Sequence, residues 1–101
     1  MNSENRFPFE TLTGAEKKKL RGLAQTIEAK IQIGRETALN EIVKQLELVF
    51  KHEDLVKVRF HIQDRKAIMA LCAEIEDAAA AFCVSQVGKT AAFFKPHTEQ
   101  A

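Results

Sequence analysis

The sequence predicts a single two-layer α/β (α+β) domain, in which a small mixed sheet has its helices packed on one face. The chain has 101 residues, a length that suits one domain, and 46% of them are hydrophobic, enough for a modest core. Helical and strand-like hydrophobic periods alternate in the order α-β-α-β-α-β-β. No internal repeat and no Gly/Ser-rich linker interrupts this order.

The first helix is expected to follow a flexible N-terminal tail, residues 1–11, which has no hydrophobic period. Thr13 and Glu16 have the spacing of a capping box, in which each side chain accepts a hydrogen bond from a backbone N–H at the start of a helix. The apolar stripe that follows has helical spacing and consists of Leu20, Leu23, Ala24 and Ile27. We therefore expect an amphipathic helix with a cationic outer face.

Residues 29–33 alternate between apolar and polar side chains, which predicts a short strand that ends at Gly34. Thr37 is the expected N-cap of a second helix. The apolar positions of this helix are Leu39, Ile42, Val43, Leu46, Val49 and Phe50. The polar run of residues 52–54 ends it.

The clearest strand spans residues 56–62, where apolar side chains alternate with Lys57, Arg59 and His61. One of its faces is apolar, and the other carries only basic or imidazole groups. Asp64 is expected to cap a third helix. The inward positions of that helix are Ile68, Leu71, Cys72 and Ile75, followed by closely packed alanines at 78–81.

The last two strands are expected at residues 82–87 and 90–95, joined by Gly88 and Lys89. A glycine at the first central position is typical of a type II′ hairpin turn. Pro96 stops the last strand. The domain is thus expected to span residues 12–96, followed by a C-terminal tail, residues 97–101.

Composition excludes several classes of protein. The longest apolar stretch, residues 78–84, is far shorter than the roughly 20 residues that cross a bilayer. Residues 1–10 contain two acids and no apolar run, so no signal peptide is expected. Because the chain has no export features, Cys72 and Cys83 favour reduced thiols and a cytoplasmic location.

The formal net charge of +1 conceals blocks of opposite sign. Residues 17–35 carry six basic side chains against one acid, and residues 57–66 carry four against one. Residues 36–56 carry five acids against two bases, and residues 67–87 carry three acids and no base. The blocks match the predicted elements in size, so basic elements can gather on one side of the molecule. Alternatively, each block is only the solvated face of its own element.

Motifs for catalysis or cofactor binding lack the spacing that their chemistry needs. Gly88-Lys89-Thr90 is no phosphate loop, because Cys83 stands where that loop has a glycine and a strand follows instead of a helix. The cysteines and the histidines at positions 52, 61 and 97 lack the spacing of zinc ligands. No catalytic residue, metal or other cofactor is expected, and the protein is predicted not to be an enzyme.

One turn suggests a contact with phosphate. Gly34 and Arg35 lie between the first strand and the second helix, where backbone N–H groups can point outward and a guanidinium can pair with phosphate oxygens. Many αβ domains have such a turn, and the alternative is a tight connection in which Gly34 only relaxes the backbone.

Several short runs resemble the chloroplast RNA splicing and ribosome maturation (CRM) family, especially its bacterial single-domain YhbY-like members. They are Leu12-Thr13, Leu20-Arg21-Gly22-Leu23-Ala24, Ile33-Gly34-Arg35, Glu53-Asp54-Leu55-Val56-Lys57-Val58, Gln86-Val87-Gly88-Lys89-Thr90 and Phe94-Lys95-Pro96. The resemblance implies RNA binding and a fold similar to the C-terminal domain of bacterial translation initiation factor three. For the bacterial members it also implies association with the precursor of the large ribosomal subunit.

The resemblance also implies which residues contact RNA. Family members carry a GxxG loop after the first strand, likened to the loop by which KH domains clamp a nucleic-acid backbone. Here the first glycine is kept as Gly34, and Thr37 replaces the second. The basic positions of the family carry over at Arg35, Lys57, Lys89 and Lys95.

The predicted function is that of a non-enzymatic RNA-binding protein that associates with ribosomal RNA of the precursor large subunit and assists its assembly. The alternative is a protein-interaction adaptor that contacts ribosomal proteins through the acidic surfaces of the second and third helices. Neither a membrane nor a small-molecule substrate is expected as a partner. The residues expected to bind RNA are Lys17, Lys18, Arg21, Gly34, Arg35, Thr37, Lys57, Arg59, Lys89 and Lys95.

Overall fold

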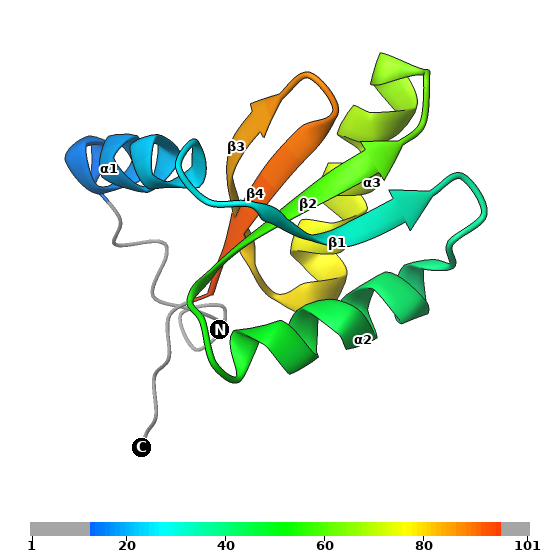
Figure 1. The fold of residues 1–101 in the computed structure, drawn as a ribbon, viewed down its shortest axis with the longest axis horizontal. Helices are drawn as coiled ribbons and strands as arrows, with labels where there is room; N and C mark the ends of the chain where they lie inside the picture. Colours follow the sequence, from blue (N-terminus) through cyan, green and yellow to red (C-terminus); the bar gives the residue numbers. More distant parts are fainter. Residues whose placement is uncertain (1–12, 96–101) are drawn as a thin grey trace, which may run out of the picture.

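The seven predicted elements all form, in the predicted order (Figure 1). The computed structural model describes residues 13–95, so the expected tails, residues 1–11 and 97–101, lie outside it. The elements are α1 (Gly14–Ala24), β1 (Ala29–Gly34), α2 (Leu39–Phe50), β2 (Leu55–His61), α3 (Arg65–Ala79), β3 (Phe82–Val87) and β4 (Thr90–Phe94). None of the helices within residues 13–95 is long and apolar enough to cross a bilayer.

The four strands form one mixed sheet in the order β1-β2-β4-β3. β1 and β2 are parallel and linked through α2, whereas β4 runs antiparallel to both β2 and β3. β4 is central because it is apolar on both of its faces: Ala91, Ala92 and Phe93 are all buried. The turn before β4 has Gly88 at φ +58°, as the predicted hairpin requires.

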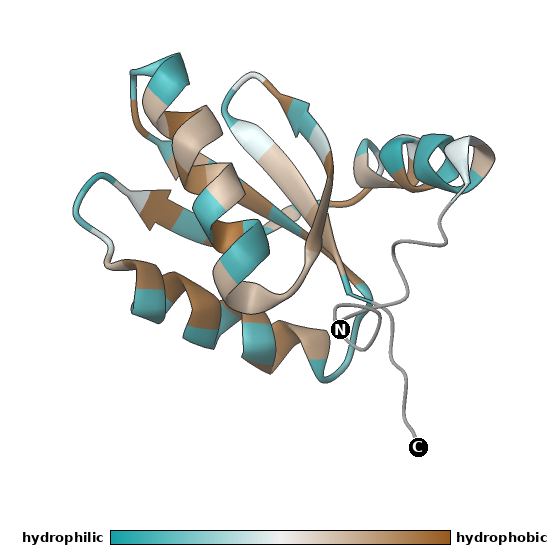
Figure 2. Cartoon of the chain, turned by 180° about the vertical axis from the view of Figure 1, so that it is seen from behind, coloured by the Kyte–Doolittle hydropathy of each residue, from teal (hydrophilic) through white to brown (hydrophobic). Residues whose placement is uncertain are grey.

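The main core lies between the sheet and the pair α2 and α3, which cover the same face (Figure 2). Val56, Val58 and Phe60 of β2 project into it, confirming the alternation predicted for that strand. The buried residues of α2 lie one helical turn apart on a single stripe, and they are Ile42, Leu46 and Phe50. The corresponding residues of α3 are Ile68, Cys72, Ile75 and Ala79.

The first helix departs from the expectation that all helices share one face, because α1 packs on the opposite side of the sheet from α2 and α3. There Ala24 joins a second cluster with Val84 and Ala92, and Leu20 packs against its edge. This face of β3 and β4 is apolar, so it too must be covered. Helical periodicity shows which stripe of α1 is buried but not against which face of the sheet.

The capping box at the start of α1 is confirmed. The Glu16 backbone N–H donates to Thr13 Oγ1 at 3.1 Å, and the Thr13 N–H donates to Glu16 Oε1 at 2.8 Å. The helix ends at Ala24, one turn earlier than the stripe suggested, and Ile27 lies half-buried in the connection to β1.

The prediction that Thr37 caps α2 is wrong, because the N-cap is Ala38 and no side-chain cap forms there among the described residues. Thr37 turns back instead, and its Oγ1 accepts a hydrogen bond from the Gly34 N–H at 3.0 Å. Local hydrogen bonds of threonine to a turn compete with capping. The cap predicted for α3 is confirmed, since Asp64 Oδ1 accepts from the Lys66 N–H at 3.0 Å.

The two cysteines lie together where α3 packs on β3. Both are free thiols, and Cys72 is buried. A hydrogen bond between the two thiols, together with burial, raises the pKa of Cys72 well above its ordinary value. Cys72 therefore behaves as a protonated, apolar core residue, in line with its position on the buried stripe of α3. No group of three or more His, Cys, Asp and Glu side chains within residues 13–95 could hold a metal ion.

Candidate nucleic-acid interface

The outer face of β1 and β2 forms a polar strip that no helix covers. We call it the open strip, and its residues are Lys30, Gln32, Lys57, Arg59 and His61. It exists because the polar residues of both strands alternate with buried ones, and because parallel pairing sets Gln32 beside Arg59. His61 Nε2 lies 2.5 Å from Gln32 Oε1, so these two side chains are held together across the strands.

Two cations of the open strip border a shallow hollow of about 420 Å³ at the start of β1. Lys57 and Arg59 line it together with Gln32 and Glu28. Lys57 Nζ lies 3.4 Å from the carbonyl oxygen of Ile27, which places the ammonium at the hollow's wall. Arg59 is exposed, and its side chain forms no ion pair within residues 13–95, so its charge is available to a ligand.

At the end of the open strip, three connections meet at one edge of the sheet, which we call the loop edge (Figure 1). It consists of residues 34–37, residues 61–65 and the turn at 88–89. Gly34 pairs with His61, the Phe60 N–H donates to the carbonyl oxygen of Lys89 at 2.7 Å, and Lys89 Nζ donates to Gln63 Oε1 at 3.1 Å. The loop edge thus contains both Arg35 and Lys89, which are far apart in the sequence.

The loop of residues 34–37 is a closed turn whose tip carries the exposed side chains of Arg35 and Glu36. Besides the bond from Gly34 to Thr37 Oγ1, the Thr37 N–H donates to the carbonyl oxygen of Gly34 at 3.2 Å. Because Thr37 is used in this way, α2 begins at Leu39 without a side-chain cap among the described residues, and the loop with Arg35 leads into this start of the helix. An uncapped helix N-terminus beside a guanidinium is a favourable place for a phosphate group.

The same loop shows that Gly34 is not required for backbone conformation. A Cβ at this position would lie 3.6 Å from Thr37 Oγ1, an ordinary contact, and the φ of Gly34 is not left-handed. The alternative in which Gly34 only relaxes the turn therefore finds no support in the geometry.

The profile of the CRS1/YhbY (CRM) domain matches residues 12–95, most of the chain. The chain belongs to this family. The fold is also similar to a solution structure from Staphylococcus aureus, of a hypothetical protein described as a candidate for RNA binding. The TM-score is 0.76 at 24% sequence identity, over 89% of this chain and 94% of that one.

Within this CRM domain, the remaining predicted residues fall in two places. Lys17, Lys18 and Arg21 are exposed on α1, where Lys17 Nζ also lies 5.0 Å from the centre of the Phe82 ring. Lys95 lies at the opposite edge of the sheet from Arg35, and its Nζ donates to the carbonyl oxygen of Ala79 at 3.2 Å. Lys95 therefore stabilises the end of α3, and the structure does not bring it to the open strip or the loop edge.

Sequence reasoning missed several polar side chains of this surface. Arg65 is exposed on the loop edge, Lys66 is exposed next to it at the start of α3, and Gln32 and His61 lie on the open strip. The strand periodicity already placed the last two on the polar faces of their strands. Parallel pairing of β1 with β2 would have brought Gln32 and His61 together. Lys30 also lies on the open strip, but its charge is offset by an ion pair with Glu53.

Proposed function

We propose that this CRM-domain protein binds RNA through the open strip and the loop edge. The observation that carries the proposal is an uncovered sheet face with Lys57 and Arg59, continuous with a loop that presents Arg35 beside an uncapped helix. Guanidinium and ammonium groups spread over such a surface suit the phosphate backbone of RNA. Membership of the CRM family and the description of the Staphylococcus aureus neighbour support the same choice of ligand.

The RNA that we propose is ribosomal RNA of the precursor large subunit, in the cytoplasm, whose assembly the protein assists without catalysing a reaction. This finer proposal is supported by the resemblance to bacterial single-domain members of the family. Contacts to phosphate carry little sequence information, so RNA shape or neighbouring ribosomal proteins would supply the specificity.

Binding of ribosomal RNA fragments should weaken steeply with salt. Neutralising roughly four to six phosphates gives a slope of about −3 to −5 in a plot of log affinity against log salt concentration. Fluorescence anisotropy with labelled fragments measures this slope. A flat salt response would contradict the proposal. Cosedimentation with precursor subunits but no binding to naked RNA would favour the adaptor function, through the acidic outer faces of α2 and α3.

Gly34→Ala should separate RNA binding from folding. The added Cβ meets only Thr37 Oγ1 at 3.6 Å, so the free energy of unfolding should change by less than about 1 kcal/mol. A phosphate backbone that passes over the loop would lose contact, and affinity should fall about tenfold. Gly14→Ala is the matched control, since a Cβ there meets nothing within 4 Å. Equal affinity of the two variants would show that RNA does not approach Gly34.

A further inference from the structure

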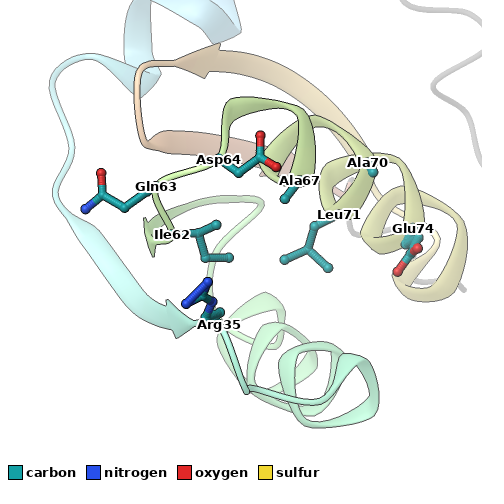
Figure 3. A pocket seen from close by; sticks show the side chains of 8 residues that line it. All are labelled: Arg35, Ile62, Gln63, Asp64, Ala67, Ala70, Leu71 and Glu74. Atoms are coloured by element: carbon teal, nitrogen blue, oxygen red, sulfur yellow. The ribbon is translucent and has the colours of Figure 1, made fainter.

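A second hollow, of about 450 Å³, lies between the loop of residues 34–37 and α3 (Figure 3). Ile62 and Leu71 form its apolar floor. On α3, the lining residues Ala67 and Ala70 have short side chains that leave the hollow open. Arg35 reaches in from the loop and lies beside Ile62, opposite Leu71 (Figure 3). The hollow thus offers an apolar surface next to one guanidinium.

The charges around this hollow distinguish between ligands. The Arg35 side chain forms no ion pair within residues 13–95, so its guanidinium is available. On the α3 side, Asp64 and Glu74 line the hollow, and both carboxylates repel a phosphate that enters. A phosphate therefore suits the outer side of Arg35, near the start of α2, whereas the interior suits an uncharged planar group.

RNA carries such a group on every nucleotide, and on the open strip only the exposed side chains of Arg59 and His61 offer it a stacking surface. All the phenylalanines within residues 13–95 are buried or half-buried, so none forms an exposed stacking platform. Bases that leave a helix need an apolar or guanidinium surface in place of their stacking partners. Within the described part of the chain, the hollow beside Arg35 combines both kinds of surface.

We propose that this hollow receives one unstacked nucleobase of the bound RNA, with Arg35 against the base and the neighbouring phosphate near the start of α2. This inference rests on the proposed function. A purine suits the site better than a pyrimidine, because its larger face covers more of the apolar floor. The domain then recognises a bulged or single-stranded purine as well as the phosphate backbone.

Two RNA hairpins that differ in one group test the inference. One carries a single bulged adenosine, and the other carries an abasic nucleotide at the same place, so that phosphates and charge are equal. Base stacking contributes enough that the protein should bind the adenosine bulge about fivefold to tenfold more tightly. Equal affinity for both hairpins would overturn the nucleobase site while leaving RNA binding intact. Binding to neither would overturn the proposed function and the nucleobase site with it.

A matched pair of variants locates the base. Ala70→Gln fills the hollow with an uncharged side chain that a helix tolerates, and Ala73→Gln makes the same change at an exposed position of α3 outside it. Ala70→Gln should bind both hairpins equally, because only the base is excluded, and Ala73→Gln should keep the preference. A preference that persists in Ala70→Gln would show that the base lies elsewhere.

Discussion

Replacing Arg35, Lys57 and Arg59 together by glutamine should lower the affinity for ribosomal RNA about a hundredfold at physiological salt, because each lost contact with phosphate contributes about 1 kcal/mol. The slope of log affinity against log salt should become shallower by about 2 to 3, since fewer counterions are released. Arg35 and Arg59 are exposed and glutamine keeps much of each aliphatic stem, so the fold should persist. Anisotropy titrations over a salt series measure both quantities.

The control for this experiment removes charge from the far side of the sheet. Lys44 is exposed on α2 and Lys51 is exposed directly after it, and changing both to glutamine lowers the net charge as much as changing Lys57 and Arg59 does. The α2 pair should retain most of the affinity, whereas the β2 pair should lose it. Equal losses for the two pairs would mean that net charge, and not the open strip, determines binding.

Phe60→Ala should destabilise the protein by about 3 to 5 kcal/mol, a large part of the stability of an ordinary domain. The side chain is 1% exposed and packs in the main core against α2 and α3. Its removal leaves a cavity that the surrounding strands and helices cannot close completely. Urea denaturation followed by circular dichroism measures the free energy of unfolding.

The neighbouring residue provides the matched control. His61 follows Phe60 on the same strand but lies on the exposed, opposite face, so His61→Ala should cost less than about 1 kcal/mol. Comparable losses at both positions would contradict the register in which β2 presents one face to the core and the other to solvent.

Periodicity predicted the elements of this fold well, because burial of one face imposes a pattern on each of them. The strand at Leu55–His61 and the stripe of α2 are clear cases. The position of α1 could not be predicted in this way, since the sheet is apolar on both faces at Ala92 and Phe93. Thr37 was misassigned because its hydroxyl suits a cap and a turn equally well, and only the folded geometry of the loop decides between them.

The candidate site was predicted only in part. The sequence shows which side chains are charged, but which of them lie near one another depends on the order in which the strands pair. Lys57 and Arg59 share a face through simple alternation, and they could be assigned to one surface from sequence. That Arg35 and Lys89 lie at the same end of the sheet depends on strand pairing, which no local pattern specifies. Lys95 carries the same charge but lies at the other edge, where it stabilises the end of α3.

The place of β4 has a consequence for how the domain forms during translation. Among the strands of residues 13–95, β4 is the last to leave the ribosome, yet it pairs with both β2 and β3, which do not pair with each other. In a nascent chain that stops before Thr90, the backbone N–H and C=O groups of β2 and β3 that pair with β4 in the folded domain therefore have no strand to pair with. The pairing of the sheet is therefore complete only after the last strand of the domain has been synthesised.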